Sequence, residues 1–429
     1  MVVFLQGIRS INASLSMATA HPYPIPPGCH AISDDLLDLR PDIDIDHTIL
    51  NPSPVTDVKN IWFFWHSGYE SMHGYTKRNI RAYHRRFSKQ GWKIRIVDQV
   101  PGSPSNIATF LDIHDPNIFP KAFREATLDG DYAKQHCSDL VRFPLLLQYG
   151  GVYADVGLLQ IGNLDALWNT TIGNPNSPYT ALSYNAGPGS NYSLTNYFLA
   201  SEPNNPFFQR CHDLLLALWA QDGGQTNTTG MHTSALLAGV YLNKGAGVDG
   251  FTITNPDGSV IPAEECAKLL SDYIIQGQVI TAVMGLKDAE TGWNGPDFTT
   301  KQIYGIEYMQ GSQLINAMTA WDGQKAFELM SLPLPKPDEA ETDAQTQARE
   351  IVEACLSKSF GFKLAHGLII RVFGETLGSL WRANPGSDVV EGTYAHWLRY
   401  GLLHFCPDEL PRSVVYELKE ASRVGRLLA

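Results

Sequence analysis

The stretch from residue 131 to residue 165 constrains the fold of this 429-residue chain more than any other stretch. Residues 131–148 read as a helix with apolar side chains on nearly every face, so the helix is predicted to be buried. The glycine pair at 150–151 then ends it, because a helix cap needs the positive φ that glycine adopts. A short apolar strand is predicted over residues 152–156, with Asp155 near its end.

The segments before this stretch alternate between strand and helix patterns. Residues 58–65 form an apolar run of strand length, residues 79–87 are basic and helix-like, and residues 92–97 alternate with period two. A strand, a helix and a second strand in succession predict a parallel unit of an α/β sheet. Open α/β sheets bind ligands at the carboxyl ends of their strands, so Asp155 is placed where a ligand site is expected.

The buried helix carries two charged residues that need partners. Asp139 and Arg142 are spaced i and i+3, which puts them on one face of the helix. Burying their charges costs free energy unless they bond each other or a ligand. Two interpretations stay open at this point, a structural ion pair and a ligand site.

The ends of the chain differ in composition from its middle. Residues 1–55 contain several prolines followed by an acidic stretch, which predicts an N-terminal arm lying on the core. A Pro-rich and then acidic linker begins near residue 332, and helical patterns follow it. We therefore expect an N-terminal arm at 1–55, a catalytic domain at 56–335 and a C-terminal helical extension at 336–429.

Composition excludes several functional classes. A formal net charge of -12 argues against nucleic-acid binding, which needs a basic surface. No apolar run reaches about 18 residues, so no transmembrane segment is expected. The N-terminal residues lack the features of a secretory signal, which favours a cytoplasmic protein without excluding the secretory route. The six cysteines show no Cys-x-x-Cys spacing, so a thiolate zinc site is not supported.

Several motifs in fixed order resemble one known family. Residues 138–142, Ser-Asp-Leu-Val-Arg, and residues 148–155, Gln-Tyr-Gly-Gly-Val-Tyr-Ala-Asp, are similar to glycosyltransferase family 32 and the related capsular polysaccharide synthesis proteins, in a fungal-like branch. Residues 61–65, 196–207 and 229–232 agree with the same pattern. The resemblance covers roughly residues 58 to 240 and implies an α/β fold of GT-A type. That fold is a Rossmann-like mixed sheet, here with the N-terminal arm and C-terminal helical extension.

The resemblance also implies roles for particular residues. It implies a retaining transferase that takes a sugar from a UDP- or GDP-sugar donor to an acceptor, both of them small molecules. Asp139 and Arg142 would hold the donor sugar or ribose, and Asp155 would meet the ribose or a metal ion. The implied nucleotide-binding residues also include Trp62, Trp65, Gly151 and Tyr153. Trp62 and Trp65 could equally be core residues, and the same holds for Tyr153.

One position departs from the family pattern. The family has an Asp-x-Asp strand end whose two carboxylates share a side and hold Mn²⁺ or Mg²⁺, whereas this chain has Asp155-Val156-Gly157. Such an ion could be held by Asp155 with help from His232 or Asp297. Alternatively Arg142 or a lysine could neutralise the diphosphate. Gly157→Asp is expected to strengthen metal binding if the family geometry is otherwise kept.

The missing carboxylate leaves a second function open. The GT-A fold could have been recruited to metal-independent chemistry, such as a cyclase or isomerase acting on a hydrophobic secondary metabolite. In that case aromatic residues such as Trp62, Trp65 and Tyr153 would line the cavity, and Asp139 or Asp155 would donate a proton. A non-catalytic binding protein is the third alternative.

Overall fold

A mixed six-stranded sheet forms the centre of the computed structural model, which describes residues 21–187, 193–238, 240, 251–255 and 257–428. In spatial order its strands are β12 (Ile303–Glu307), β6 (Ala181–Asn185), β7 (Leu194–Ser201), β4 (Gly151–Ala154), β2 (Asn60–Phe64) and β3 (Lys93–Val97). All are parallel except β7, which runs antiparallel to both of its neighbours. The mixed α/β sheet expected from the sequence is confirmed.

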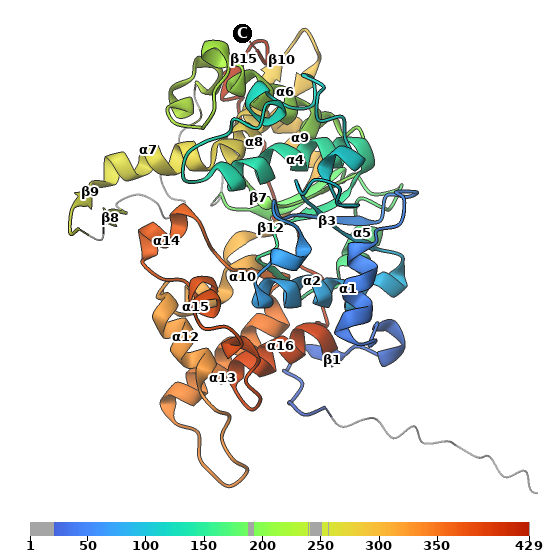
Figure 1. The fold of residues 1–429 in the computed structure, drawn as a ribbon, viewed down its shortest axis with the longest axis vertical. Helices are drawn as coiled ribbons and strands as arrows, with labels where there is room; N and C mark the ends of the chain where they lie inside the picture. The colour runs from blue at the N-terminus through green and yellow to red at the C-terminus, as the bar shows by residue number, and fades with distance from the viewer. Residues whose placement is uncertain (1–20, 188–192, 239, 241–250, 256, 429) are drawn as a thin grey trace, which may run out of the picture.

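Helices cover both faces of this sheet (Figure 1). Alternate residues of β2 point to opposite faces, with Ile61 and Phe63 in one hydrophobic cluster and Trp62 and Phe64 in another. The Trp62 face is covered by α4 (Ala133–Tyr149), α6 (Pro206–Trp219) and α8 (Ile275–Gly285). The Ile61 face is covered by α1 (Asp42–Leu50), α2 (Gly74–Phe87) and α5 (Leu164–Thr170). Both faces are therefore buried, as the apolar strands require.

The predicted helix–glycine–strand turn positions Asp155. Helix α4 ends at Tyr149, and Gly150 and Gly151 follow with φ of 66° and 90°. A Cβ on Gly151 would lie 2.3 Å from the carbonyl oxygen of Asn60 in the neighbouring strand. Only glycine allows this close backbone approach, which sets the register between β4 and β2.

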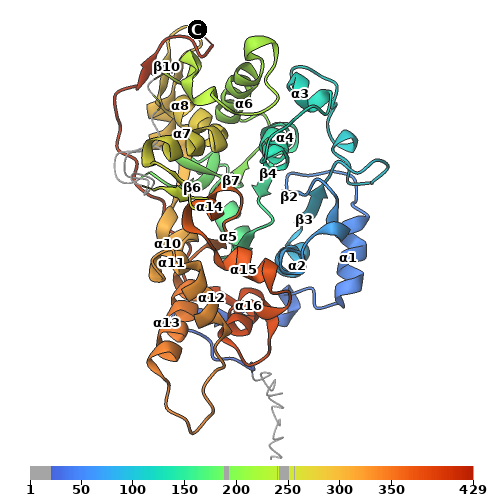
Figure 2. The same ribbon diagram turned by 60° about the vertical axis from the view of Figure 1, so that its left-hand side comes forward.

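A helical layer from the C-terminal part of the chain lies beyond α2 (Figure 2). It contains α11 (Leu314–Met318), α12 (Gly323–Ser331), α13 (Asp343–Lys358), α15 (Leu377–Ala383) and α16 (Tyr394–His404), which share one hydrophobic cluster. The boundary expected at residue 336 falls between α12 and α13, which both contribute to that cluster. The division at residues 55 and 335 stays a prediction.

Pairs of strands tie the C-terminal part to the rest of the chain. Strand β1 (Cys29–Ala31) pairs antiparallel with β14 (Phe405–Pro407), and β5 (Leu158–Gln160) pairs antiparallel with β13 (Gly361–Lys363). The second pair matters most for the site, because β5 begins three residues after Asp155.

The remaining strands and helices extend the upper part of the molecule in Figure 1 or connect the layers. They are α3 (Lys121–Arg124), β8 (Ile253–Thr254), β9 (Val260–Ile261), α7 (Ala263–Tyr273), β10 (Leu286–Asp288), β11 (Trp293–Asn294), α9 (Gly295–Gln302), α10 (Tyr308–Ser312), α14 (Leu368–Phe373) and β15 (Arg423–Val424).

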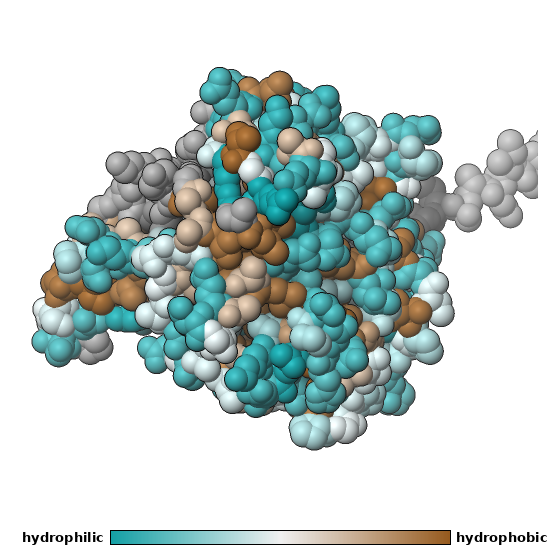
Figure 3. All heavy atoms as spheres, turned by 90° about the horizontal axis from the view of Figure 1, so that it is seen from above, coloured by the Kyte–Doolittle hydropathy of each residue, from teal (hydrophilic) through white to brown (hydrophobic). Residues whose placement is uncertain are grey.

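The surface at the upper end of the molecule is mostly hydrophilic, with hydrophobic residues interspersed (Figure 3). Over the described residues, no helix combines the length and the apolar character that crossing a lipid bilayer would require.

Candidate active site

The candidate site lies at the carboxyl edge of the parallel strands β2 and β4. Asp155 directly follows β4, and Trp65 directly follows β2. The backbone N–H of Asp155 donates to the carbonyl oxygen of Tyr197 on β7 at 2.9 Å, which fixes the end of the strand. The side chain of Asp155 keeps 27% of its surface exposed, so its carboxylate can be reached from solvent.

Arg142 joins the two predicted carboxylates. Its guanidinium lies 2.9 Å from Asp139 Oδ1 and 3.5 Å from Asp155 Oδ1, and the side chain is only 3% exposed. The guanidinium also lies 4.8 Å from the ring centre of Tyr153. The structure thus brings Asp139, Arg142 and Asp155 into one cluster, in which Arg142 is both an ion-pair partner and a link to the strand end.

Asp139 is held almost entirely by protein partners. Its Oδ1 accepts from Asn196 Nδ2 at 3.2 Å and forms an ion pair with Arg142 at 2.9 Å, and its Oδ2 lies 3.3 Å from His136 Nδ1. Its side chain is 11% exposed, compared with 27% for Asp155. Asp155 is therefore the more exposed of the two carboxylates.

A lysine from the C-terminal part completes the cluster and was not singled out from the sequence. Lys363 Nζ lies 3.1 Å from Asp155 Oδ2, with the lysine side chain 14% exposed. Lys363 is the last residue of β13 and stands opposite Leu158 in the β5–β13 pair. No motif around Lys363 marks it in the sequence, because its position depends on a pairing between strands that are far apart in the chain.

The residues around Gly157 also come from the C-terminal part. A Cβ on Gly157 would lie 3.0 Å from the carbonyl oxygen of Leu364, 3.5 Å from Lys363 Nζ and 3.5 Å from the ring of His366. His366 Nε2 and the Tyr75 hydroxyl share a hydrogen bond at 3.0 Å. Burial, with repulsion from Lys363 as the next cause, lowers the pKa of His366 to about 3, so its imidazole is neutral.

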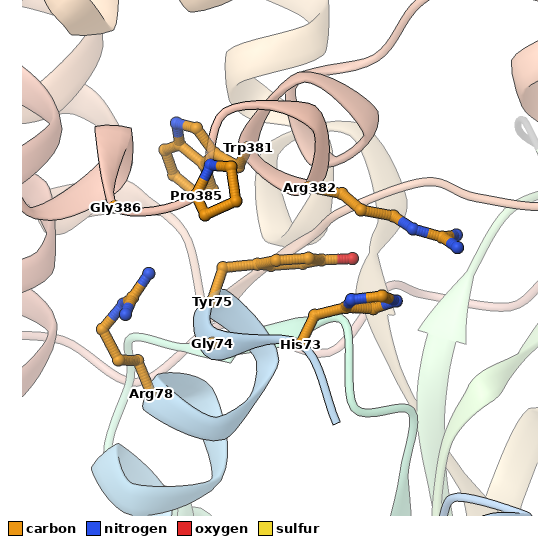
Figure 4. Close-up of a pocket in the computed structure, with 8 residues that line it drawn as sticks. All are labelled: His73, Gly74, Tyr75, Arg78, Trp381, Arg382, Pro385 and Gly386. Atoms are coloured by element: carbon orange, nitrogen blue, oxygen red, sulfur yellow. The ribbon is translucent and has the colours of Figure 1, made fainter. Parts of the chain in front are cut away.

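Tyr75 also lines a small pocket (Figure 4). It measures about 120 Å³ and lies between the start of α2 and the segment at α15, and its lining residues are His73, Gly74, Tyr75, Arg78, Trp381, Arg382, Pro385 and Gly386. In Figure 4 the side chains of His73 and Arg382 lie near the hydroxyl end of Tyr75. Tyr75 thus lines this pocket and also bonds His366, whose ring lies near Gly157.

The four other predicted nucleotide-binding residues lie in different surroundings. Trp62 is fully buried, and its indole N–H donates to the carbonyl of Gly150 at 3.0 Å. Gly151 begins β4, at the opposite end of the strand from Asp155. Tyr153 is fully buried beneath Arg142 and bonds Ser138 Oγ at 2.6 Å. Trp65 is partly exposed at the strand end and bonds Ser71 Oγ at 3.1 Å.

The two expected helper residues for a metal lie apart from Asp155 in the described contacts. His232 Nδ1 lies 2.8 Å from Asp272 Oδ1 near the end of α7. Asp297 pairs with Lys301 at 2.7 Å on the exposed side of α9. Within the described ranges, no group of three or more His, Cys, Asp or Glu residues is arranged to hold a metal ion. The six cysteines are all free.

With this mixed α/β sheet, the chain is a glycosyltransferase, as its relatives show. Residues 38–232 match the capsular polysaccharide synthesis protein family. The chain belongs to this family, as do the fungal glycosyltransferases that it resembles. O-glycosyltransferase braB of Annulohypoxylon truncatum is 32% identical over 386 residues, covering 89% of this chain and 88% of that protein. Glycosyltransferase afumC of Aspergillus fumigatus is 30% identical, covering 83% and 88%. O-glycosyltransferase PaGT of Phomopsis amygdali is 29% identical, covering 88% and 90%.

These relatives confirm the resemblance that the motifs predicted. The solved PaToxG glycosyltransferase is 17% identical and covers 43% of this chain and 70% of its own, with a TM-score of 0.26, which is too low for a comparison of the two folds.

Proposed function

We propose that this protein transfers a sugar from a UDP- or GDP-sugar to a hydroxyl group of a small-molecule acceptor, with retention of the anomeric configuration. The observation that carries the proposal is the cluster of Asp155, Arg142 and Lys363 at the carboxyl edge of the sheet. An accessible carboxylate can bind sugar or ribose hydroxyls, while two adjacent cations suit the diphosphate of such a donor.

The reaction assigns distinct tasks to these groups. The bond between the anomeric carbon and the β-phosphate oxygen breaks, and its electron pair stays on the phosphate. The acceptor oxygen bonds the anomeric carbon, and its proton passes to the released nucleoside diphosphate. Asp155 binds hydroxyl groups of the donor and so orients it, and Arg142 holds Asp155 in place. Trp65, partly exposed at the end of β2, offers its ring to the nucleotide base.

The acceptor oxygen is inferred from the relatives. Two of them, from Annulohypoxylon truncatum and Phomopsis amygdali, bear the name O-glycosyltransferase. Each match covers close to nine tenths of this chain. A hydroxyl group is therefore the acceptor function that we propose.

The alternative function, a cyclase or isomerase acting on a hydrophobic metabolite, is less well supported, because the residues that it requires are placed differently. Trp62 and Tyr153 were expected to line a hydrophobic cavity, yet both have 0% exposure and serve the core. The residues nearest Asp155 are charged, with Lys363 and Arg142 both within 4 Å of its carboxylate.

The test is a direct assay of donor consumption. Purified protein is incubated with UDP- and GDP-sugars and a panel of hydroxyl-bearing small molecules, and the released nucleoside diphosphate is measured. Acceptor-dependent release from one donor class is the expected result. Conversion of a hydrophobic substrate while no nucleotide is consumed would contradict the proposal.

A further inference from the structure

Lys363 occupies the place where the family pattern has its second carboxylate. Here residues 156 and 157 form a turn after β4, and the backbone N–H of Leu158 closes it by donating to the carbonyl oxygen of Asp155 at 2.9 Å. A Cβ added to Gly157 would lie 3.5 Å from Lys363 Nζ. The same nitrogen is 3.1 Å from Asp155 Oδ2. The pattern's second anion is thus replaced by a cation from another part of the chain.

The residues present do not fit a divalent ion at Asp155. Mn²⁺ and Mg²⁺ need several oxygen ligands, usually one or two carboxylates together with substrate phosphates. Here Asp155 is the single carboxylate at the strand end, and its two oxygens face Arg142 and Lys363 at 3.5 and 3.1 Å. An ion bound to either oxygen would be repelled by two positive charges at short range.

Lys363 is held in position before any ligand arrives. The β5–β13 pair fixes its backbone, and its ammonium lies 5.5 Å from the ring centre of Tyr197. The ammonium donates to the carbonyl oxygen of Leu364 at 3.3 Å in addition to its contact with Asp155. An ammonium has three N–H donors, so the described contacts leave a third for a ligand. Because its side chain is only 14% exposed, its charge is weakly screened by water.

We infer that Lys363, together with Arg142, neutralises the donor diphosphate in place of a divalent metal ion. The inference rests on the proposed function. As the bond from the anomeric carbon to the β-phosphate oxygen breaks, negative charge builds on that phosphate, and the Lys363 ammonium donates a hydrogen bond to it. Binding and transfer therefore proceed when divalent ions are removed.

The experiment compares melting temperatures of the full chain with and without UDP or GDP, in excess EDTA and in Mn²⁺. A bound nucleotide stabilises the folded protein by mass action. We expect one nucleotide to raise the melting temperature equally in both buffers. The affinity of the Lys363→Met variant for this nucleotide should fall about 10- to 100-fold, as expected for the loss of a hydrogen bond to a charged group.

Two controls separate phosphate binding from general disruption. Lys59 pairs with Asp165 at 2.6 Å, is 27% exposed and lies 5.7 Å from the ring centre of Trp92, at the opposite edge of the sheet. Lys59→Met removes a comparable ion pair and should leave nucleotide affinity unchanged. Lys363→Met should bind the matching nucleoside, which lacks phosphates, as well as the unchanged protein does.

Each alternative result has its own meaning. A nucleotide shift seen only with Mn²⁺ overturns the role of Lys363 and leaves the proposed transferase standing. Unchanged nucleotide affinity in Lys363→Met overturns it as well. Equal loss of nucleoside and nucleotide binding in that variant would reduce Lys363 to a structural role. The absence of any shift with UDP or GDP in either buffer overturns the proposed function itself.

Discussion

Arg142 is the residue on which the geometry of the cluster depends. It is buried between Asp139 and Asp155 and faces the ring of Tyr153. Burial alone opposes its charge, but the nearby carboxylates outweigh burial and raise its pKa, so the guanidinium stays protonated. A buried charge with two partners on different elements holds helix α4 and the end of β4 in one arrangement.

The Asp155 carboxylate is predicted to be required for turnover and dispensable for folding. In Asp155→Asn the side chain keeps its shape but loses the charge that pairs with Lys363 and Arg142. Acceptor-dependent nucleotide release should fall by about 10²- to 10³-fold, the usual cost of losing one well-placed electrostatic group. Circular dichroism should be unchanged. Activity within a few fold of the unchanged protein would remove Asp155 from the reaction.

Gly157→Asp was expected from the sequence to strengthen metal binding, and the surroundings of Gly157 lead to a different prediction. The new Cβ would stand 3.0 Å from the carbonyl oxygen of Leu364, and the new carboxylate would meet Lys363. An ion pair with Lys363 should form, so nucleotide affinity in EDTA should fall while Mn²⁺ affinity stays low. Isothermal titration with Mn²⁺ and with UDP measures both. Tight Mn²⁺ binding by this variant would restore the first expectation.

The sequence predicted the part of the site that is local in the chain. Asp139 and Arg142 share a helix face, and Asp155 directly follows the next strand, so spacing and periodicity sufficed to group them. Lys363 could not be found in this way, because nothing in its neighbourhood specifies that β13 pairs with β5. The buried position of Trp62 was left open, since an aromatic residue in an apolar strand has the same pattern on either face.

At the scale of elements, the β5–β13 pair is the structure that brings the C-terminal part to the site. Its register places Gly361 opposite Gln160 and Lys363 opposite Leu158. Gly361 is closely packed, because a Cβ there would lie 2.7 Å from the Tyr184 hydroxyl and 2.9 Å from the carbonyl oxygen of Leu159. The absence of a side chain at Gly361 therefore lets the two strands approach.

Gly361→Ala is predicted to disturb this pair and the site together. The added methyl group meets a backbone oxygen that cannot move away freely, and overpacking of this kind costs about 1 to 3 kcal/mol. Displacing β13 also displaces Lys363, so nucleotide affinity should fall along with the free energy of unfolding. Gly277→Ala, at a helical position where the Cβ would have open space, is the matched control and should be neutral or stabilising. Chemical denaturation and nucleotide titration of both variants are the measurements.

At the scale of the whole molecule, the C-terminal layer is locked to α2 by a buried charge cluster. Asp388 has no exposed surface and bonds Arg78 of α2 at 3.0 Å, and Arg399 of α16 lies 2.7 Å from it. Arg399 also donates to Asn79, whose amide bonds the carbonyl oxygen of Val156 at 2.8 Å. A chain of bonds thus runs from Asp388 to the residue between Asp155 and Gly157, so the C-terminal layer and the site are positioned together.

The stability that Asp388 provides is predicted to depend on pH. Burial alone would raise the pKa of its carboxyl, but attraction to Arg399 and the hydrogen bond from Arg78 outweigh burial and lower it. A carboxyl whose pKa is lowered in the folded state stabilises the protein at pH values above its pKa in the unfolded state, about 3.9. It loses that contribution as pH falls further.

At pH 7, Asp388→Asn should cost about 3 to 5 kcal/mol, because it breaks a buried ion pair and leaves two arginines short of a partner. Asparagine does not titrate, so the difference in unfolding free energy between the two proteins should shrink below pH ~4. Other carboxylates titrate alike in both proteins and cancel in this difference. Urea unfolding of both proteins at pH 7, 5 and 3 measures it, and a difference that stays constant down to pH 3 would show that Asp388 does not carry its charge in the fold as described.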